Sequence, residues 1–115
     1  MSAYAVGHLR AAAQHEDIFV YMERIQATLD PFGGQFLVHG TEVEVLEGEW
    51  PGNLVVIGFP DLAKARDWYD SEAYQELLPL RTRHVAGEVI LVEGVAPGYD
   101  AADTAARLRQ RHRAA

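Results

Sequence analysis

Alternation of apolar and polar side chains marks the parts of this sequence that are expected to form strands. Residues 4–11 alternate between a mixed set and a set of small apolar residues, and residues 35–40 and 87–94 have the length and composition of strands. Residues 53–59 form the most apolar run, which is typical of a central strand. Residues 42–47 also alternate, and this pattern favours a strand that continues a long hairpin.

The first predicted strand carries two sets of side chains, which point to opposite faces of the sheet. The small set contains Ala5, Gly7 and Leu9 and suits a face pressed against helices. The mixed set, which includes Val6 and His8, suits a face that lines a cavity or an interface. A slip of one residue in register would exchange the two faces.

Apolar residues at spacings of three and four predict a helix over residues 15–30. Its stripe consists of Ile18, Met22, Ile25 and Leu29. Pro31 is expected to end this helix, and Gly33-Gly34 supplies the turn that follows.

Three further helices are predicted in the second half of the chain. Residues 61–70 and 71–80 form two consecutive helices, the second of them capped by Ser71. A terminal helix over residues 101–113 contains only Leu108 as a large apolar residue.

The resulting order is β-α-β-β-α-β, which predicts an α+β, ferredoxin-like antiparallel sheet with its helices on one face. The other face would carry apolar residues such as Val6, Val56 and Ile90. An exposed apolar face of this size is expected to be buried against another surface. A second copy of the chain, packed sheet against sheet, is the simplest one, so we expect a homodimer.

Composition limits the class of protein. The 115 residues are 49% hydrophobic, enough for one domain with a modest core. The chain has no cysteine, which excludes disulfides, thiol catalysis and cysteine-based zinc sites. No apolar run is long enough to span a bilayer and no signal-peptide pattern opens the chain, so a cytoplasmic protein without membrane association is expected.

The net charge of −7 is unevenly distributed. Residues 1–100 are strongly acidic, which argues against nucleic-acid binding by the domain. The last residues carry four alternate arginines, Arg107, Arg109, Arg111 and Arg113, against a single acidic residue, Asp103. A solvated helix, packed on or frayed from an acidic surface, explains this tail more simply than a nucleic-acid site.

Several local motifs together resemble the DUF1330 family. They are the Gly33-Gly34 turn, the Glu47-Gly48 pair, Phe59-Pro60, and the run Trp68-Tyr69-x-Ser71-x-x-Tyr74 leading to Arg81. The resemblance covers residues 4–94. It implies a dimeric α/β-barrel fold for a domain over residues 1–96, with residues 97–115 as a basic helical tail outside the pattern.

The resemblance also implies a pocket but no settled activity. Related branches of the superfamily resemble cofactor-free monooxygenases, dehydratases, muconolactone-type isomerases and haem-degrading enzymes. Fold likeness of this kind narrows function little.

Two strand histidines are the best candidates for proton transfer. His8 and His39 lie on predicted strands, and an unperturbed imidazole titrates near neutral pH. The alternative is that each is a hydrogen-bonded structural residue. The remaining histidines, His15, His84 and His112, lack metal-binding spacing. No nucleotide-binding motif is present, so neither a metal nor a cofactor is expected.

Aromatic residues and one cation form the candidate binding set: Trp50, Trp68, Tyr69, Tyr74 and Arg81. Aromatic rings with a guanidinium suit a flat, acidic or carbonyl-bearing ligand, because Arg81 can hold a carboxylate with two hydrogen bonds. The alternative places Trp68 and Tyr69 in the core and pairs Arg81 with a nearby carboxylate. Trp50, in a Gly-Pro turn, either caps the pocket or packs across the dimer.

Two carboxylates, Glu47 and Glu93, each precede a glycine at the end of a predicted strand. Together they form a possible acid–base pair, although exposed surface carboxylates explain them more simply.

The sequence therefore predicts a homodimer that binds a small organic molecule, such as an aromatic or polyketide-like acid. As an enzyme it would run cofactor-free proton transfer, with His8 or His39 as base and Arg81 orienting the anionic group. The alternative is a binding module without catalysis, or a purely structural dimer.

Overall fold

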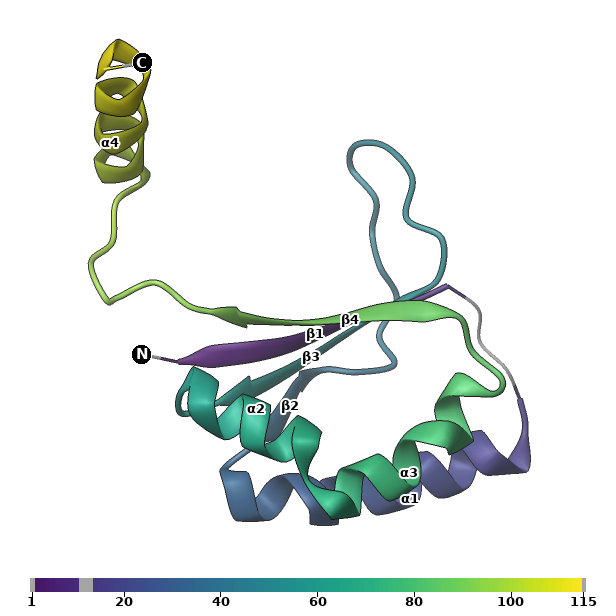
Figure 1. Cartoon of the computed structure of the whole chain (residues 1–115). Helices are drawn as coiled ribbons and strands as arrows, with labels where there is room; N and C mark the ends of the chain where they lie inside the picture. The colour runs from purple at the N-terminus through teal and green to yellow at the C-terminus, as the bar shows by residue number, and fades with distance from the viewer. Residues whose placement is uncertain (1, 11–13, 115) are drawn as a thin grey trace.

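A four-stranded antiparallel sheet is the framework of the protein, in the order β2-β3-β1-β4. The computed structural model describes residues 2–10 and 14–114. The strands are β1 (Ala3–Leu9), β2 (Gln35–Val38), β3 (Asn53–Phe59) and β4 (Gly87–Glu93). Their order along the chain confirms the predicted β-α-β-β-α-β arrangement and the ferredoxin-like fold (Figure 1).

The helices α1 (Glu16–Leu29), α2 (Leu62–Asp70) and α3 (Glu72–Thr82) cover one face of the sheet (Figure 1). A short 3-10 helix, η1 (Asp30–Phe32), continues α1. The last helix, α4 (Ala101–Ala114), stands away from the sheet at the end of an extended connection (Figure 1). None of the helices within the described residues is long and apolar enough to cross a membrane.

Side-chain caps set where the helices begin. The Asp61 carboxylate accepts a hydrogen bond from the Lys64 amide at the start of α2. The Ser71 hydroxyl accepts one from the Tyr74 amide, which confirms its predicted capping role at α3. Because Ser71 has an extended backbone between α2 and α3, the chain turns there and lays the two helices end to end.

The glycine pair after η1 brings the end of α1 close to the sheet. Gly33 has a φ of 71°, a left-handed conformation that favours glycine. A Cβ atom at Gly34 would lie 2.8 Å from side-chain atoms of Leu29 and Phe59. The first glycine therefore provides the turn, and the second allows α1 to pack tightly against β3.

The predicted two-faced pattern of β1 is confirmed. Ala3 and Ala5 are buried against the helices, together with Ile57 and Phe59 of the neighbouring β3. The helices contribute Leu29, Ala65, Trp68 and Tyr74 to the same cluster. This core lies between the sheet and the helices.

Residues 42–47 do not form the predicted strand. The chain leaves the sheet after Val38 and returns only at Asn53, and the intervening loop rises from the end of the sheet (Figure 1). Gly40 and Gly48 have positive φ angles and interrupt the extended backbone on either side of the segment. Leu46 is 86% exposed, so the alternation of this segment reflects no buried face.

The sheet face opposite the helices is apolar and open in the single chain. Val6 of β1 pairs with Val56 on one side and Ile90 on the other, as expected from the sequence. Ile90 is 55% exposed and Leu37 of β2 is 53% exposed. We call this surface the open sheet face.

Candidate ligand cavity

A cavity of about 310 Å³ lies between the helix-covered face of the sheet and the helices α1 and α3. Its sheet wall is made by small or branched residues, Ala5, Gly7, Val55, Ile57 and Val89. Its helix wall includes Ile18, Met22, Ile25, Tyr74 and Arg81. The volume falls at the lower end of the range for small-molecule sites, and the lining is mostly apolar, as in such sites.

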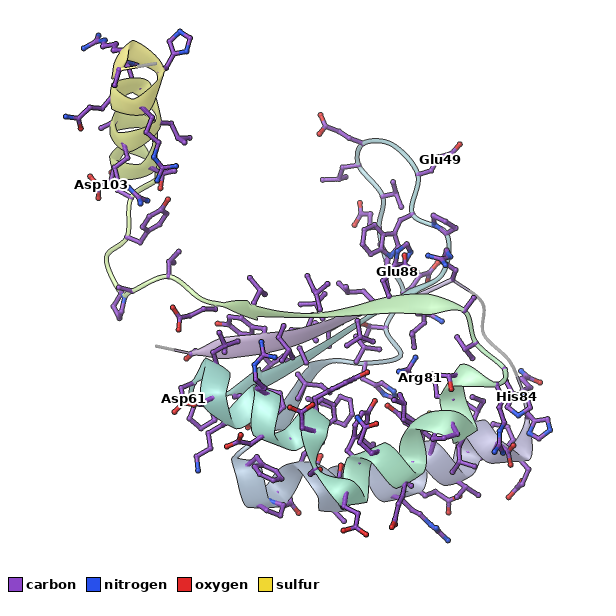
Figure 2. The ribbon with its side chains drawn as sticks, in the orientation of Figure 1. Glu49, Asp61, Arg81, His84, Glu88 and Asp103 are labelled. Carbon is purple, nitrogen blue, oxygen red and sulfur yellow. The ribbon has the colours of Figure 1, made fainter. Side chains whose placement is uncertain are left out.

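Arg81 is the only charged side chain among the described residues that line the cavity. It lies near the end of α3, on the side that faces the sheet (Figure 2), and only 7% of the residue is exposed. No carboxylate of the described residues lies within ion-pair distance of its guanidinium. The alternative in which Arg81 pairs with a nearby acidic residue therefore finds no support in the described part of the chain.

Two tyrosines stand beside this guanidinium. The hydroxyl oxygens of Tyr21 and Tyr74 are 2.8 Å apart and share a hydrogen bond, and Arg81 Cζ lies 5.8 Å from the centre of the Tyr21 ring. Burial, followed by the proximity of Tyr74, raises the pKa of Tyr21 above its ordinary value, so this phenol stays protonated. Burial lowers the pKa of Arg81, but the two phenols outweigh it and the net shift is upward.

Trp68 serves the core and the cavity together. Its Nε1 donates to Thr28 Oγ1 at 3.0 Å, and its ring centre is 4.1 Å from that of Tyr74. With 2% of its surface exposed, Trp68 is a core residue whose inner edge lines the cavity. Tyr69 packs on the outside of this cluster and does not line the cavity.

His39 lines the cavity from the loop that follows β2. It is exposed, and its ring centre lies 4.9 Å from that of Phe36. Phe19 and Met22, also in the lining, are 44% and 42% exposed. These exposures place His39 at the mouth, whereas the buried Arg81 and Trp68 lie deeper.

His8 and Trp50 lie on the other side of the sheet. Their rings stack with centres 4.2 Å apart, and His8 Nε2 donates to the carbonyl oxygen of Pro51 at 2.7 Å. His8 belongs to the residues of β1 that face away from the helices, and Trp50 does not line the cavity. The structure therefore separates these two from the other members of the predicted site.

The structure adds residues that the sequence analysis missed. Tyr21 and Phe36 line the cavity, and Tyr21 follows Ile18 by three residues, so it shares the predicted apolar stripe of α1. Glu47 and Glu93 are both exposed and lie outside the lining, in separate parts of the fold. The described residues that can together hold a metal ion, His15, Asp17 and His84, lie outside it too.

The fold is shared with several solved structures of low sequence identity. The RPA0582 protein of unknown function from Rhodopseudomonas palustris has a TM-score of 0.63 at 16% identity, over 84% of each chain. SnoaB from Streptomyces nogalater, a cofactor-independent oxygenase, has a TM-score of 0.52 at 11% identity, over 86% of this chain and 96% of the other.

A NIPSNAP domain protein from Burkholderia xenovorans has a TM-score of 0.51 at 16% identity, over 87% of this chain and all of the other. Comparison with curated protein sequences found no significant match. The family described as a domain of unknown function, DUF1330, matches residues 2–95 of this chain. The match includes β1 to β4 and every described residue that lines the cavity. The chain therefore belongs to the DUF1330 family.

Proposed function

We propose that the cavity binds a small organic acid with a flat apolar body. The observation that carries this proposal is the buried guanidinium of Arg81, which faces an apolar cavity without a carboxylate partner in the described residues. Burying a charge is unfavourable unless it is paired. A ligand carboxylate or enolate supplies that pair, and a guanidinium holds it with two parallel hydrogen bonds.

The remaining lining fits the body of such a ligand. Trp68 and Tyr74 present aromatic surface at the depth of Arg81, and the Tyr21–Tyr74 hydroxyl pair adds hydrogen-bonding groups beside the cation. The sheet wall is apolar, with Gly7 and Val55 among its residues. The site therefore favours a planar molecule with one anionic end and no second charge.

In the catalytic form of the proposal, His39 takes a proton from a carbon acid bound in the cavity. The C–H bond breaks, its proton moves to the imidazole, and the electron pair remains on the substrate as an enolate that Arg81 stabilises. This chemistry needs a base and a cation that reach the same bound molecule, and His39 and Arg81 line one cavity. The same fold in SnoaB carries a cofactor-independent oxygenase.

Replacing His39 by alanine is expected to slow proton exchange without abolishing binding. Phenylpyruvate, an aromatic acid with acidic C–H bonds, serves as the probe, and deuterium exchange in D2O is followed by NMR. Loss of a general base lowers the rate by about 10²- to 10⁴-fold. The matched control is His8→Ala, which removes a histidine from the opposite face of the sheet and leaves the exchange rate unchanged.

The outcome also separates catalysis from simple binding. Exchange at the same rate in wild type, His39→Ala and His8→Ala contradicts the catalytic form. Binding of phenylpyruvate with no enzyme-dependent exchange in wild type favours a binding module.

We propose in addition that a second copy of the chain covers the open sheet face. Val6, Val56 and Ile90 form a continuous apolar row across β3, β1 and β4. The stacked pair of Trp50 and His8 extends it at one end, and Trp50 remains 40% exposed in the single chain. A two-fold symmetric, sheet-to-sheet contact buries this surface on both copies at once.

Replacing Ile90 by glutamate is expected to convert the dimer into monomers. The two-fold contact introduces the new carboxylate twice, and a buried carboxylate without a partner is strongly unfavourable. Sedimentation velocity at several protein concentrations measures the mass. Ala73→Glu, on an exposed position of α3, is the matched control and leaves the dimer intact. A wild-type monomer, or an Ile90→Glu dimer as stable as wild type, contradicts the proposal.

A further inference from the structure

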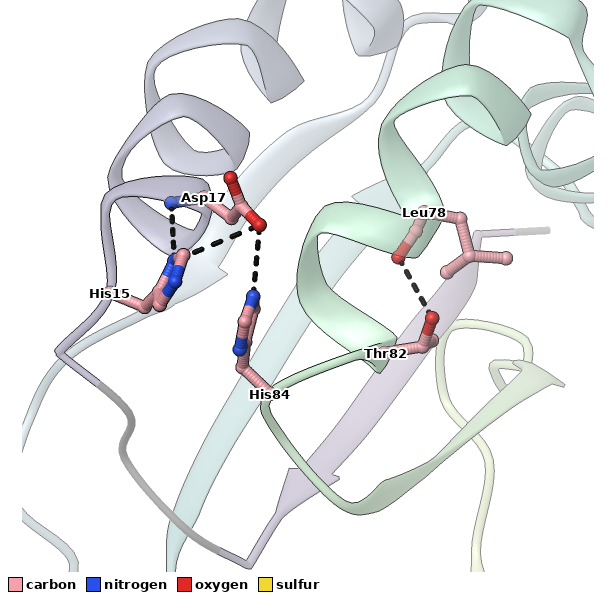
Figure 3. Close-up of polar contacts among 5 residues, drawn as sticks. All are labelled: His15, Asp17, Leu78, Thr82 and His84. Atoms are coloured by element: carbon pink, nitrogen blue, oxygen red, sulfur yellow. Dashed lines mark hydrogen bonds and ion pairs between the residues drawn. The ribbon is translucent and has the colours of Figure 1, made fainter.

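Three potential metal ligands meet at one end of the helix layer, outside the cavity. His15 and Asp17 belong to the start of α1, and His84 follows α3 (Figure 3). Each offers one ligand atom, and these atoms all lie within 4.8 Å of one another. We call these three residues the His-Asp-His cluster.

The cluster is already ordered by its own contacts. His84 Nε2 donates to Asp17 Oδ2 at 2.9 Å, and His15 Nδ1 lies 3.7 Å from the same oxygen. The two imidazole rings stack with centres 3.8 Å apart (Figure 3). Asp17 Oδ2 therefore lies near a nitrogen atom of each imidazole, so the three potential ligand atoms gather in one small region.

We propose that His15, Asp17 and His84 bind one divalent transition-metal ion of the zinc class. Two imidazole nitrogens and one carboxylate oxygen form a donor set that suits zinc, nickel and copper. Magnesium and calcium prefer sets made only of oxygen atoms, so the same cluster discriminates against them. His15 is exposed and the other two are half-buried, which leaves solvent access for water to complete the coordination.

The charges around the cluster are compatible with a cation. Asp17 brings a carboxylate to the cluster, held in place by the hydrogen bond that it accepts from His84. Glu16 adds a second negative charge in the first turn of α1. Arg83 places a positive charge near Asp17, and this charge and the positive end of the α1 dipole both disfavour a bound cation. With two carboxylates and one guanidinium nearby, the charge around the cluster does not oppose a cation.

Binding requires small rearrangements of the two rings. His15 Nδ1 now accepts the Asp17 backbone N–H at 3.0 Å and caps α1, so an ion on this nitrogen replaces the cap. On His84, an ion at Nε2 replaces the proton that bridges to Asp17, and the ring of a neutral His84 then carries its proton on Nδ1. The stacked rings must also turn toward the ion.

The position of the cluster gives the ion a structural role. It would join the first turn of α1 to the segment that leads from α3 into β4. Gln14 and Ile18 on one wall, and Arg81 and Val85 on the other, line the cavity beside the cluster. An ion here therefore fastens together the two walls of one end of the cavity.

Calorimetric titration of the full-length, tag-free protein with ZnCl2 at pH 7.5 tests the proposal. We expect one zinc ion per chain and no heat from MgCl2. His84→Ala and His15→Asn each weaken zinc binding at least about tenfold, since each removes a nitrogen ligand. Asparagine at position 15 keeps a capping oxygen for α1, so the loss is not attributable to an unfolded helix. His112→Ala, on the exposed part of α4, is the matched control and binds as wild type.

Thermal unfolding gives an independent measurement. Zinc should raise the Tm of wild type, EDTA should reverse the rise, and His84→Ala should show neither effect, because an ion stabilises only the state that binds it. No zinc binding by wild type, unchanged binding in both His84→Ala and His15→Asn, or loss of binding in His112→Ala overturns the proposal.

Discussion

Replacing Arg81 by methionine is expected to weaken the binding of 2-naphthoate by about 10- to 150-fold, the equivalent of the ~1.5–3 kcal/mol that hydrogen bonds to a charged group contribute. Methionine keeps an unbranched apolar side chain in the cavity wall but removes the cation and its donors. Arg81 is 7% exposed and has no acidic partner among the described residues. The described lining contains no other lysine or arginine that could replace it. Calorimetric titration of both proteins measures the difference.

Two controls identify the charge as the cause. The neutral analogue 2-naphthalenemethanol should bind wild type and Arg81→Met with equal affinity, because only the acid interacts with the cation. Arg81→Lys should recover part of the affinity, since an ammonium keeps the charge without the two-pronged geometry. Circular dichroism confirms that each variant is folded. Equal binding of 2-naphthoate by wild type and Arg81→Met contradicts the acid-binding proposal.

The fold was predictable because its elements repeat clear periodicities. β1 and β4 alternate between more and less buried residues, β3 is the most apolar run, and Ser71 provides a capping signal that the structure confirms. Residues 42–47 have the same alternation but no strand to pair with in the described part of the chain. Local pattern alone does not distinguish a strand from an extended loop, because the ladder hydrogen bonds come from elsewhere in the sequence.

The position of the cavity was harder to predict. The small residues of β1, Ala5 and Gly7, indicated close packing against helices, whereas the mixed set containing His8 indicated a cavity or an interface. In the structure the small residues leave the space that forms the cavity, under the first half of α1. A small side chain permits close approach or a void, and the distance of the opposing helix decides which of the two occurs.

Candidates from different elements were brought together only in part. Trp68 of α2 and Tyr74 and Arg81 of α3 line the same cavity, and the sequence suggested this grouping by residue type, aromatic rings with one cation. Trp50 lies in a loop whose direction no periodicity specifies. The ligands of the His-Asp-His cluster are separated by 67 residues between Asp17 and His84, and only the packing of α1 against α3 places them in contact.

Replacing Trp68 by alanine is expected to lower the free energy of unfolding by about 3–5 kcal/mol, the usual range for removing a fully buried tryptophan. Trp68 packs against Phe59 of β3 and Tyr74 of α3, so it joins the sheet to both α2 and α3. Its Nε1 also donates a hydrogen bond to the hydroxyl of Thr28, a buried threonine of α1. Urea unfolding followed by circular dichroism, at one fixed protein concentration, measures the loss.

The size of this effect follows from how little the site can relax. Trp68 is held on one side by the sheet and on the other by α1, through Thr28, whose hydroxyl in turn donates to the Ile25 carbonyl oxygen. Trp68→Phe should lower the free energy of unfolding less than Trp68→Ala does. Phenylalanine still places an aromatic ring in the core, and the Thr28 hydroxyl keeps its hydrogen bond to the Ile25 carbonyl oxygen. Leu108→Ala, on exposed α4, is the control and should stay within about 0.5 kcal/mol of wild type. A Trp68→Ala protein that unfolds at the wild-type urea concentration would show that the helix layer closes over the missing ring, and that the cavity wall beside Arg81 is held by Tyr74 instead.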